Sequence, residues 1–241
     1  MPTDSNSFYT SAPIRQLFVQ ELAALAPILS GVFGTVGLFL RADAGTPAAL
    51  PTHLLGTIID LALENPDRFG GRLACVPAEL PLVSESCKLV IAQHVFERLD
   101  DPTDCIAEFS RVLGPEGVAL VLGFNPVSLW RPWLVGKTRR AAVSLRPRSA
   151  QNCQQILATH GIETLQTRYL GASSPWLRRG QATADAQDGD WRSPLFGRIG
   201  GSWLLLARKR RSALTPLRLR RSARELAINP RFAPGAHREC A

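Results

Sequence analysis

The sequence predicts an α/β domain in which a mostly parallel sheet is covered by helices on both faces. Apolar runs without polar alternation recur along the chain, notably at 36–40, 88–93 and 117–124. Such runs are typical of strands buried on both faces. Segments with helical periodicity separate them, which is the order of a parallel sheet with crossover helices. With 45% hydrophobic and 20% charged residues in 241, the composition is that of a globular protein and excludes a disordered chain.

The N-terminal third contains one clear helix and up to three strands. After an arm over residues 1–12, a helix is predicted over 13–29 because apolar residues recur at helical spacing. These residues are Ile14, Leu17, Phe18, Leu22, Leu25 and Ile28. Residues 36–40 predict a buried strand that runs into a loop. The stretch 53–63 fits either a strand or a helix, and 72–76 predicts a further strand.

The middle of the chain predicts a strand, a helix and a second strand. The apolar run 88–93 is the first strand. Asp101 is expected to cap the helix, with Pro102 at its first position and Gly114 ending it. The run 117–124 is the second strand.

The last third adds one helix and two strands. Ser149 is expected to cap a helix that Gly161 ends, and strands are predicted at 162–170 and 202–207. Between those strands, 171–200 is predicted as a long excursion. We assign 13–210 to the folded domain. Residues 211–241 form the predicted basic tail, with a short helix around 219–227.

The positive charge is concentrated at the C-terminal end of the chain. The formal net charge is +8, from 28 Lys and Arg against 20 Asp and Glu. Ten of the basic and two of the acidic residues lie in 205–241, which leaves 18 of each in 1–204. The body is therefore neutral. Nucleic acid or an anionic membrane surface is a candidate partner of the Arg-rich tail.

The cysteines and histidines indicate a cytoplasmic protein without a metal site. The five cysteines are widely spaced and include no CxxC pair, and the four histidines are scattered. A disulfide framework or a zinc site would show paired spacing. The first residues also lack the basic and apolar regions of a signal peptide.

The longest uncharged run, 22–40, leaves an alternative open. It is 19 residues long, near the lower limit for a membrane-spanning helix. Pro27 and three glycines interrupt it, which favours a helix end, a turn and a buried strand. A single-span membrane anchor is the competing interpretation.

Two segments resemble the class I S-adenosylmethionine-dependent methyltransferases. Leu80-Pro81-Leu82 is followed by VSESCKLVIAQHVFERLDDP, and then by EFSRVLGPEGVALVLGFNPVSLW. This ordered set is similar to the methyltransferase type 11 domain, which is the ubiquinone/menaquinone methyltransferase-like branch. The GFNPxSLW continuation and the final LLLARKR strand look most like the short uncharacterised bacterial YafS-like proteins.

The resemblance implies a Rossmann-like class I methyltransferase fold with a mostly parallel, seven-stranded sheet. It also implies S-adenosylmethionine as cofactor and a small-molecule acceptor. Methyl transfer from a sulfonium is a direct displacement, so the protein mainly aligns the reactants and excludes water. No catalytic side chain is therefore predicted.

The cofactor is expected at the carboxyl ends of the strands. The candidate cofactor-binding residues are Asp43, Gly45, Asp60, Ala78, Glu79, Leu80, Gln93 and His94. Within this set Asp60 is the expected ligand of the ribose hydroxyls, with Glu64 as its competitor. His94 is equally well explained as a buried histidine with satisfied hydrogen bonds.

Three positions depart from the pattern of the family. The loop after the first predicted strand, 41–45, contains only Gly45 where two or three glycines are usual. Val76 stands where an Asp usually contacts the adenine, and Lys88 where an Asp usually opens the fourth strand. These departures favour the contrasting hypothesis, a catalytically degenerate member of the fold that acts as a binding or scaffold module through its tail.

Two features are candidates for contact with the acceptor. Asn125 follows the 117–124 strand, and Trp130 opens a stretch to Arg148 with six basic residues and no acidic one. That stretch suits an acidic acceptor or a lipid-headgroup surface. A solvated loop is the simpler explanation. The oligomeric state is not predicted.

Overall fold

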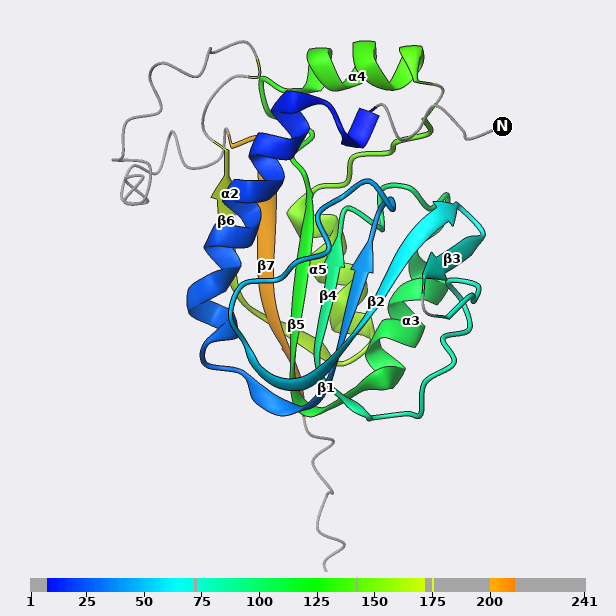
Figure 1. Cartoon of the computed structure of the whole chain (residues 1–241), viewed down its shortest axis with the longest axis vertical. Coiled ribbons are helices and arrows are strands. Elements are labelled where there is room, and N and C mark those ends of the chain that lie inside the picture. The colour runs from blue at the N-terminus through cyan, green and yellow to red at the C-terminus, as the bar shows by residue number, and fades with distance from the viewer. Residues whose placement is uncertain (1–7, 72, 142, 172–174, 176–199, 211–241) are drawn as a thin grey trace, which may run out of the picture. The chain divides into compact units, whose positions relative to one another are not determined.

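The computed structural model describes residues 8–71, 73–141, 143–171, 175 and 200–210, which contain one seven-stranded sheet (Figure 1). Its strand order is β3-β2-β1-β4-β5-β7-β6. The strands are β1 (Phe33–Arg41), β2 (Leu54–Asn65), β3 (Arg68–Gly71), β4 (Cys87–Gln93), β5 (Leu113–Phe124), β6 (Ile162–Leu170) and β7 (Ser202–Lys209).

The sheet is mostly parallel, as the sequence predicts. β1 pairs in parallel with β2 and β4, and β4 pairs in parallel with β5. β3 runs antiparallel to β2, and β7 runs antiparallel to both β5 and β6. The ambiguous stretch 53–63 is thus a strand. It lies between β1 and the short edge strand β3, and its buried residues are concentrated at Leu61, Ala62 and Leu63, where β3 pairs with it.

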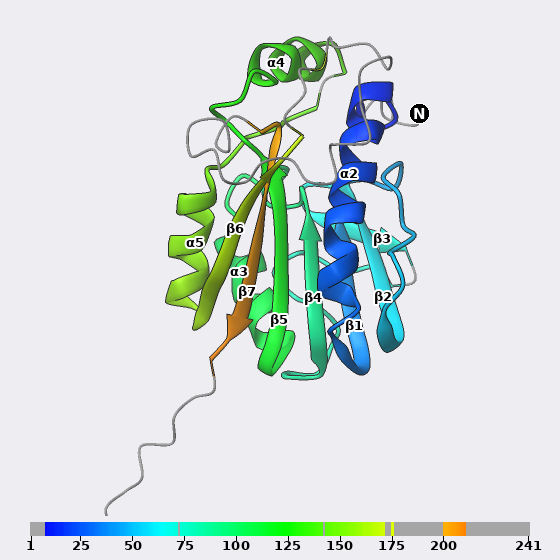
Figure 2. The same cartoon turned by 90° about the vertical axis from the view of Figure 1, so that its left-hand side faces the viewer.

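Helices cover both faces of the sheet (Figure 2). The helices are α2 (Ala12–Leu29), α3 (Thr103–Val112), α4 (Arg131–Arg140) and α5 (Ala150–Thr159). α2 lies on one face, and α3 and α5 lie on the other. α4 lies beyond the end of the sheet where the parallel strands finish, which we call the carboxyl edge (Figure 1).

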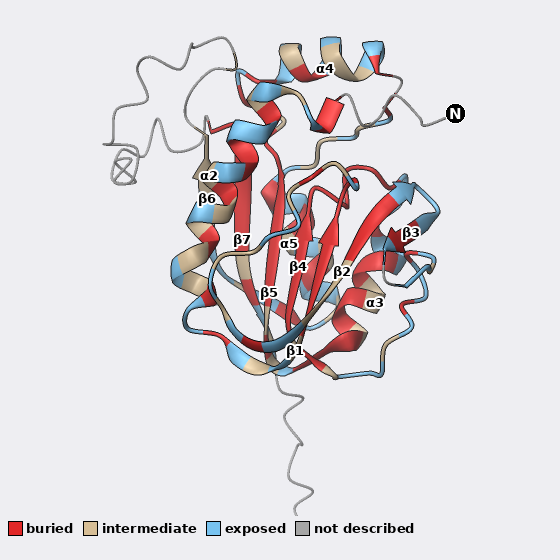
Figure 3. Cartoon of the chain, in the orientation of Figure 1, coloured by how far each residue is buried: buried red, intermediate tan, exposed pale blue. Residues whose placement is uncertain are grey.

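Three clusters of buried apolar side chains hold these layers together, and Figure 3 shows the buried strands between them. Strand alternation sends Leu38 and Leu40 toward α3 and α5, and Phe39 toward α2. The third cluster lies beyond the carboxyl edge, and we call it the cap cluster. Its buried members are Phe8, Tyr9, Ile14, Leu17, Phe18, Ala42, Phe124, Trp130, Leu134, Ala141 and Val143.

The prediction of a strand at 72–76 is wrong. The edge strand is β3, which pairs with the end of β2 through a tight hairpin. The side chain of Asn65 accepts a hydrogen bond from the backbone N–H of Asp67 (3.0 Å), which stabilises that turn. Residues 73–76 contribute only isolated bridges through Cys75 and Val76.

The ends of α3 also differ from the prediction, whereas those of α5 confirm it. α3 begins at Thr103, and Asp101 Oδ1 accepts from the Thr103 N–H at 2.9 Å. Gly114 does not end the helix, because Leu113 already belongs to β5. Ser149 Oγ caps α5 by accepting from Asn152 N–H, and Gly161 follows the helix with a φ of +75°.

The apolar run 22–40 is divided between two elements rather than forming one helix. α2 ends at Leu29 and β1 begins at Phe33. None of the helices in the described part of the chain is both long and apolar enough to cross a membrane. The structure therefore favours the helix–turn–strand interpretation of this run.

Two further predictions fall partly or wholly outside the described residues: the excursion over 171–200, and the tail over 211–241 with its short helix.

The helix α4 was not predicted from the sequence. Its low apolar content gives no amphipathic stripe, and Pro132 in its first turn is the one local signal of a helix start.

Candidate functional site

The connection from β1 to β2 passes directly through the region where a cofactor is expected, and it contains no helix. Residues 42–53 join the two parallel strands as a loop. This loop crosses the α2 face of the sheet, where Leu50 packs against the apolar cluster. The usual helix of a parallel crossover, with its free N–H groups at the N-terminus, is therefore missing after β1.

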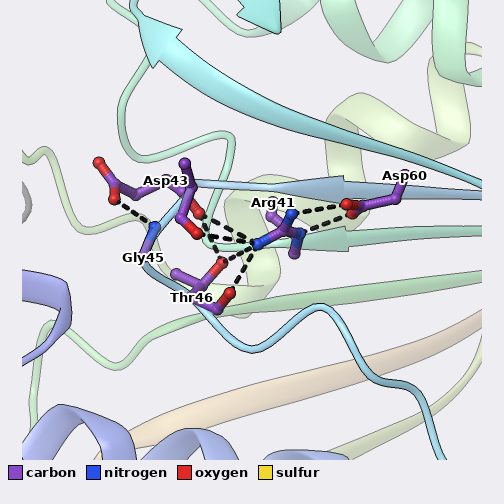
Figure 4. Close-up of polar contacts among 6 residues, drawn as sticks. Arg41, Asp43, Gly45, Thr46 and Asp60 are labelled. Carbon is purple, nitrogen blue, oxygen red and sulfur yellow. Dashed lines mark hydrogen bonds and ion pairs between the residues drawn. The ribbon is translucent and has the colours of Figure 1, made fainter. Parts of the chain in front are cut away.

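Arg41, the last residue of β1, forms a two-pronged ion pair with Asp60 in the middle of β2 (Figure 4). Arg41 Nε and Nη2 each donate to one carboxylate oxygen of Asp60 at 2.6 Å. The Arg41 side chain is 8% exposed and that of Asp60 31%. Both oxygens of the predicted ribose ligand are thus already engaged by an internal cation.

The remaining nitrogen of Arg41 holds the loop. Nη1 donates to the backbone oxygen of Thr46 at 2.6 Å, with longer contacts to the oxygens of Asp43 and Ala44 at 3.5 and 3.4 Å. Within the loop, Gly45 N–H donates to Asp43 Oδ1 at 2.8 Å. The predicted cofactor residues Asp43 and Gly45 therefore form an ordinary turn that is closed on itself.

A second arginine closes the same turn from the other side. Arg98 Nη1 donates to the backbone oxygen of Ala42 at 3.1 Å and lies 3.6 Å from Asp43 Oδ2. The Arg98 guanidinium also lies over the ring of Tyr9, 5.8 Å from its centroid. Two arginines thus neutralise the two acidic residues predicted for the cofactor, Asp43 and Asp60.

His94 lies at the carboxyl edge between two glutamates and is fully buried. Its Nε2 is 2.9 Å from Glu21 Oε1 on α2, and its Nδ1 is 3.1 Å from Glu97 Oε2. Gln93 Nε2 donates to the other oxygen of Glu21 at 2.9 Å. Glu97 also accepts a hydrogen bond from the backbone N–H of Phe124. These bonds pin α2 to the ends of β4 and β5.

The charge state of His94 follows from these contacts. Burial lowers the pKa of His94, but the charges and hydrogen bonds of Glu21 and Glu97 outweigh burial and raise it to about 10. A pKa of about 10 favours the protonated ring at neutral pH, in which Nε2 donates to Glu21 and Nδ1 donates to Glu97, whose own pKa is raised by burial. This is the buried, satisfied histidine that the sequence left as one alternative.

The backbone of His94 is also unusual, with a φ of +54°. A non-glycine residue adopts this conformation at some cost in free energy, which the two ring hydrogen bonds offset.

The turn Ala78-Glu79-Leu80 packs on α3 rather than on the ion pairs. Leu80 N–H donates to Glu108 Oε2 at 2.8 Å, and Arg111 donates to the backbone oxygens of Leu80 and Leu82 at 2.9 Å. Ala78 lines a surface hollow between the β2–β3 turn and the start of α3, together with Asp67, Leu99, Asp100 and Asp104 among others. The side-chain hydrogen bonds described for this turn go to Glu108 and Arg111 on α3, and those of Asp43 and Asp60 go to other residues.

Asn125 and Trp130, the predicted acceptor contacts, are both buried in the cap region. Asn125 Nδ2 donates to the backbone oxygen of Gly200 at 2.9 Å, and its Oδ1 accepts from Val127 N–H at 3.1 Å. Trp130 belongs to the cap cluster and packs edge-on against Trp133, with ring centroids 5.7 Å apart. Both side chains support the cap in this structure.

Sequence reasoning missed Glu21, Glu97, Arg41 and Arg98 as members of the site. Glu21 could have been found, because it falls in the apolar stripe of α2 between Phe18 and Leu25 and is fully buried. A carboxylate on a buried helix face needs a partner from elsewhere in the fold. Nothing local in the sequence distinguishes the other three from surface charges.

Comparison with known proteins agrees with the fold. Residues 59–121 match the family model of a methyltransferase domain. An S-adenosylmethionine-dependent methyltransferase from Thermotoga maritima superposes with a TM-score of 0.56 at 14% identity. That alignment covers 81% of this chain and 91% of the other. A chain from the complex of the Haloferax volcanii Trm112 methyltransferase activator with a candidate methyltransferase superposes with a TM-score of 0.52 at 12% identity, covering 86% and 98%.

The chain therefore has the fold of the class I methyltransferases, and residues 59–121 match a methyltransferase domain within it. Among curated proteins it is similar to YafS of Escherichia coli strain K12, a protein described as uncharacterised. The two are 27% identical over 171 residues. The match spans 68% of this chain and 65% of YafS, just under two thirds of that relative's length.

The cofactor that the family implies is S-adenosylmethionine, but the residues at the carboxyl edge do not fit the way such enzymes hold it. Asp60 has both oxygens engaged by Arg41, and the N–H groups of Gly45 and Thr46 donate to Asp43 within the turn. Among the described residues, the buried side-chain atoms without a hydrogen-bond partner are Tyr9 Oη, Gln93 Oε1 and Ser202 Oγ. One amide oxygen and two hydroxyl groups do not replace a ribose carboxylate and a glycine-rich loop.

Proposed function

We propose that this chain is an S-adenosylmethionine-dependent methyltransferase that acts on a small-molecule acceptor. The observation that carries the proposal is the sheet order β3-β2-β1-β4-β5-β7-β6 together with the methyltransferase-domain match over β2 to β5. The reaction class is a direct displacement, in which the protein contributes alignment and a dry site. It requires no side chain with a perturbed pKa, so we assign none to catalysis.

The site of action that we propose is the cytoplasm. Four cysteines in the described part of the chain are free thiols, and three of them are buried. Unpaired cysteines are typical of a reducing compartment.

A second function is favoured by the Arg41–Asp60 pair. If the two carboxylates stay neutralised by Arg41 and Arg98, the fold keeps its shape without a cofactor and serves as a binding module. In that case the basic residues of α4 and the tail provide the contact surface. Arg139 and Arg140 are exposed at the end of α4, beyond the carboxyl edge.

One experiment separates the two functions. The Tm of the full chain is measured with and without 1 mM S-adenosylmethionine or S-adenosylhomocysteine. Binding of each compound is measured separately by calorimetric titration. A ligand that binds only the folded state must stabilise it. At 100 times the dissociation constant the gain is about 2.7 kcal/mol. For a domain of this size that gain raises Tm by roughly 5–10 °C.

ATP at the same concentration is the control, because an anion also binds weakly to a basic chain. Stabilisation by both S-adenosyl compounds and not by ATP supports the methyltransferase. No heat and no change in Tm with either compound would mean that the fold serves as a binding module.

A further inference from the structure

The Arg41–Asp60 pair has the features of a structural ion pair that anchors the loop, rather than of an unoccupied ligand-binding site. Every nitrogen of the Arg41 guanidinium has an acceptor: two carboxylate oxygens on β2 and backbone oxygens in the 43–46 loop. The side chain is nearly buried. A cation in this position is stable only while its partners remain, because burial of an unpaired guanidinium is costly.

The chain has a reason to need an anchor at this point. A parallel β1–β2 connection normally returns through a helix that packs on the sheet. Here residues 42–53 return without one, so the loop has no internal ladder of helical hydrogen bonds to hold it. Arg41 Nη1 donates to backbone oxygens of the loop at Asp43, Ala44 and Thr46, and Nε and Nη2 of the same side chain donate to Asp60 on β2.

The geometry also explains why the partner is Asp60. Asp60 lies opposite Phe39 in the β1–β2 register, so Arg41 is its diagonal neighbour on the α2 face. At this distance the planar guanidinium meets both carboxylate oxygens at once, as Figure 4 shows. The same carboxylate has no remaining oxygen that is free of Arg41.

We propose that the Arg41 guanidinium takes the place of the cofactor's ribose hydroxyls as the partner of Asp60. Asp60 anchors the loop that replaces the first crossover helix, and it does not bind a ribose. This inference concerns the site of the proposed function, but it holds whether or not the chain transfers methyl groups. Any S-adenosyl compound that the chain binds is then held without Asp60.

The test is a double-mutant cycle on Tm without ligand. The variants are Arg41→Met, Asp60→Asn and the double variant that carries both substitutions. Each single variant is expected to lower Tm by about 5 °C or more, because it leaves the other group unpaired. The Tm of the double variant is expected to fall by much less than the sum of the two single decreases, since both groups belong to one interaction. Arg41→Lys, which keeps the charge and loses the two-pronged geometry, is expected to fall between wild type and Arg41→Met.

The matched control is the neighbouring ion pair of Arg68 and Glu64. These two side chains are 58% and 55% exposed and 3.7 Å apart. Arg68→Met, Glu64→Gln and their combination are expected to change Tm by less than about 2 °C, because exposed pairs contribute little. The proposal that this pair anchors the loop is overturned if the Tm decreases at Arg41 and Asp60 are no larger than those of the control pair, or if they are fully additive. Arg41→Lys gives this comparison even if Arg41→Met does not fold.

The second readout is the dissociation constant of S-adenosylhomocysteine. If wild type binds it, Asp60→Asn is expected to bind it within about threefold. A tenfold or larger loss of affinity in Asp60→Asn overturns the proposal, whatever its Tm. If wild type does not bind it, the methyltransferase function fails, while the Tm cycle still decides whether the pair is an anchor.

Discussion

The buried imidazolium of His94 makes the stability of this protein depend on pH in the neutral range. His94 lies between Glu21 of α2 and Glu97, and its pKa rises from 6.5 to about 10 in the folded chain. A pKa that is higher in the folded state contributes stability in full below about pH 6.5. That stability is lost as pH rises from about 6.5 to 10. Between pH 6 and pH 9 the loss amounts to about 3 kcal/mol.

For a domain of about 200 residues, this loss lowers Tm by roughly 6–12 °C between pH 6 and pH 9. The measurement is thermal unfolding followed by circular dichroism at half-unit pH steps. It stops at pH 9 because burial raises the pKa of Cys105 and Cys153 to about 12. The stability from these thiols also falls with rising pH, but only above about pH 9.

The variant that isolates the effect is His94→Asn. Asparagine tolerates a positive φ better than most residues, so the backbone at this position stays favourable. This variant is expected to be less stable at pH 6 and to lose the slope between pH 6 and pH 9. His160→Gln, at the half-buried end of α5, is expected to keep the wild-type slope. A wild-type Tm that changes by less than about 2 °C, or an equal slope in His94→Asn, refutes the reasoning.

Two further outcomes follow from the structure and the sequence. Arg111→Lys is expected to cost about 1–2 kcal/mol in urea unfolding, because a lysine cannot bond Glu108, Leu80 and Leu82 together as Arg111 does. Arg68→Lys is the exposed control, and an equal effect of both contradicts the prediction. A chain that ends at Arg211 is expected to keep Tm within about 2 °C and to lose most of its retention on heparin, because the charge excess lies in the tail. Unchanged retention would assign the basic surface to 131–148 instead.

The pattern of apolar residues was sufficient to place several strands of the sheet. β4 and β7 lie within a few residues of their predicted positions, because buried strands read as apolar runs. The edge strand β6 also lies at its predicted position, although most of its residues are exposed or half-buried. Helix α5 was also predictable, since Ser149 provides a local cap at its start and Gly161 a left-handed residue after its end.

Local pattern failed where a longer-range pairing decides. The short edge strand β3 lies four residues before its predicted position, because the hairpin register with β2 selects it and not its own apolar content. The absence of a helix after β1 was likewise not predictable. Arg41, the last residue of β1, donates hydrogen bonds to the 42–53 loop, and its pairing with Asp60 on β2 has no local signal in the sequence.

For the candidate site, the sequence alone determined which residues stand at the carboxyl ends of the strands, and also that the glycine-rich loop of the family is missing. Only the tertiary structure decided what those residues do. Arg41 meets Asp60 across 19 positions of sequence, and His94 meets Glu21 across 73. Charges so far apart in sequence carry no local signal of their pairing. Their burial, which makes the pairing necessary, exists only once α2 and the cap cluster have packed against the sheet.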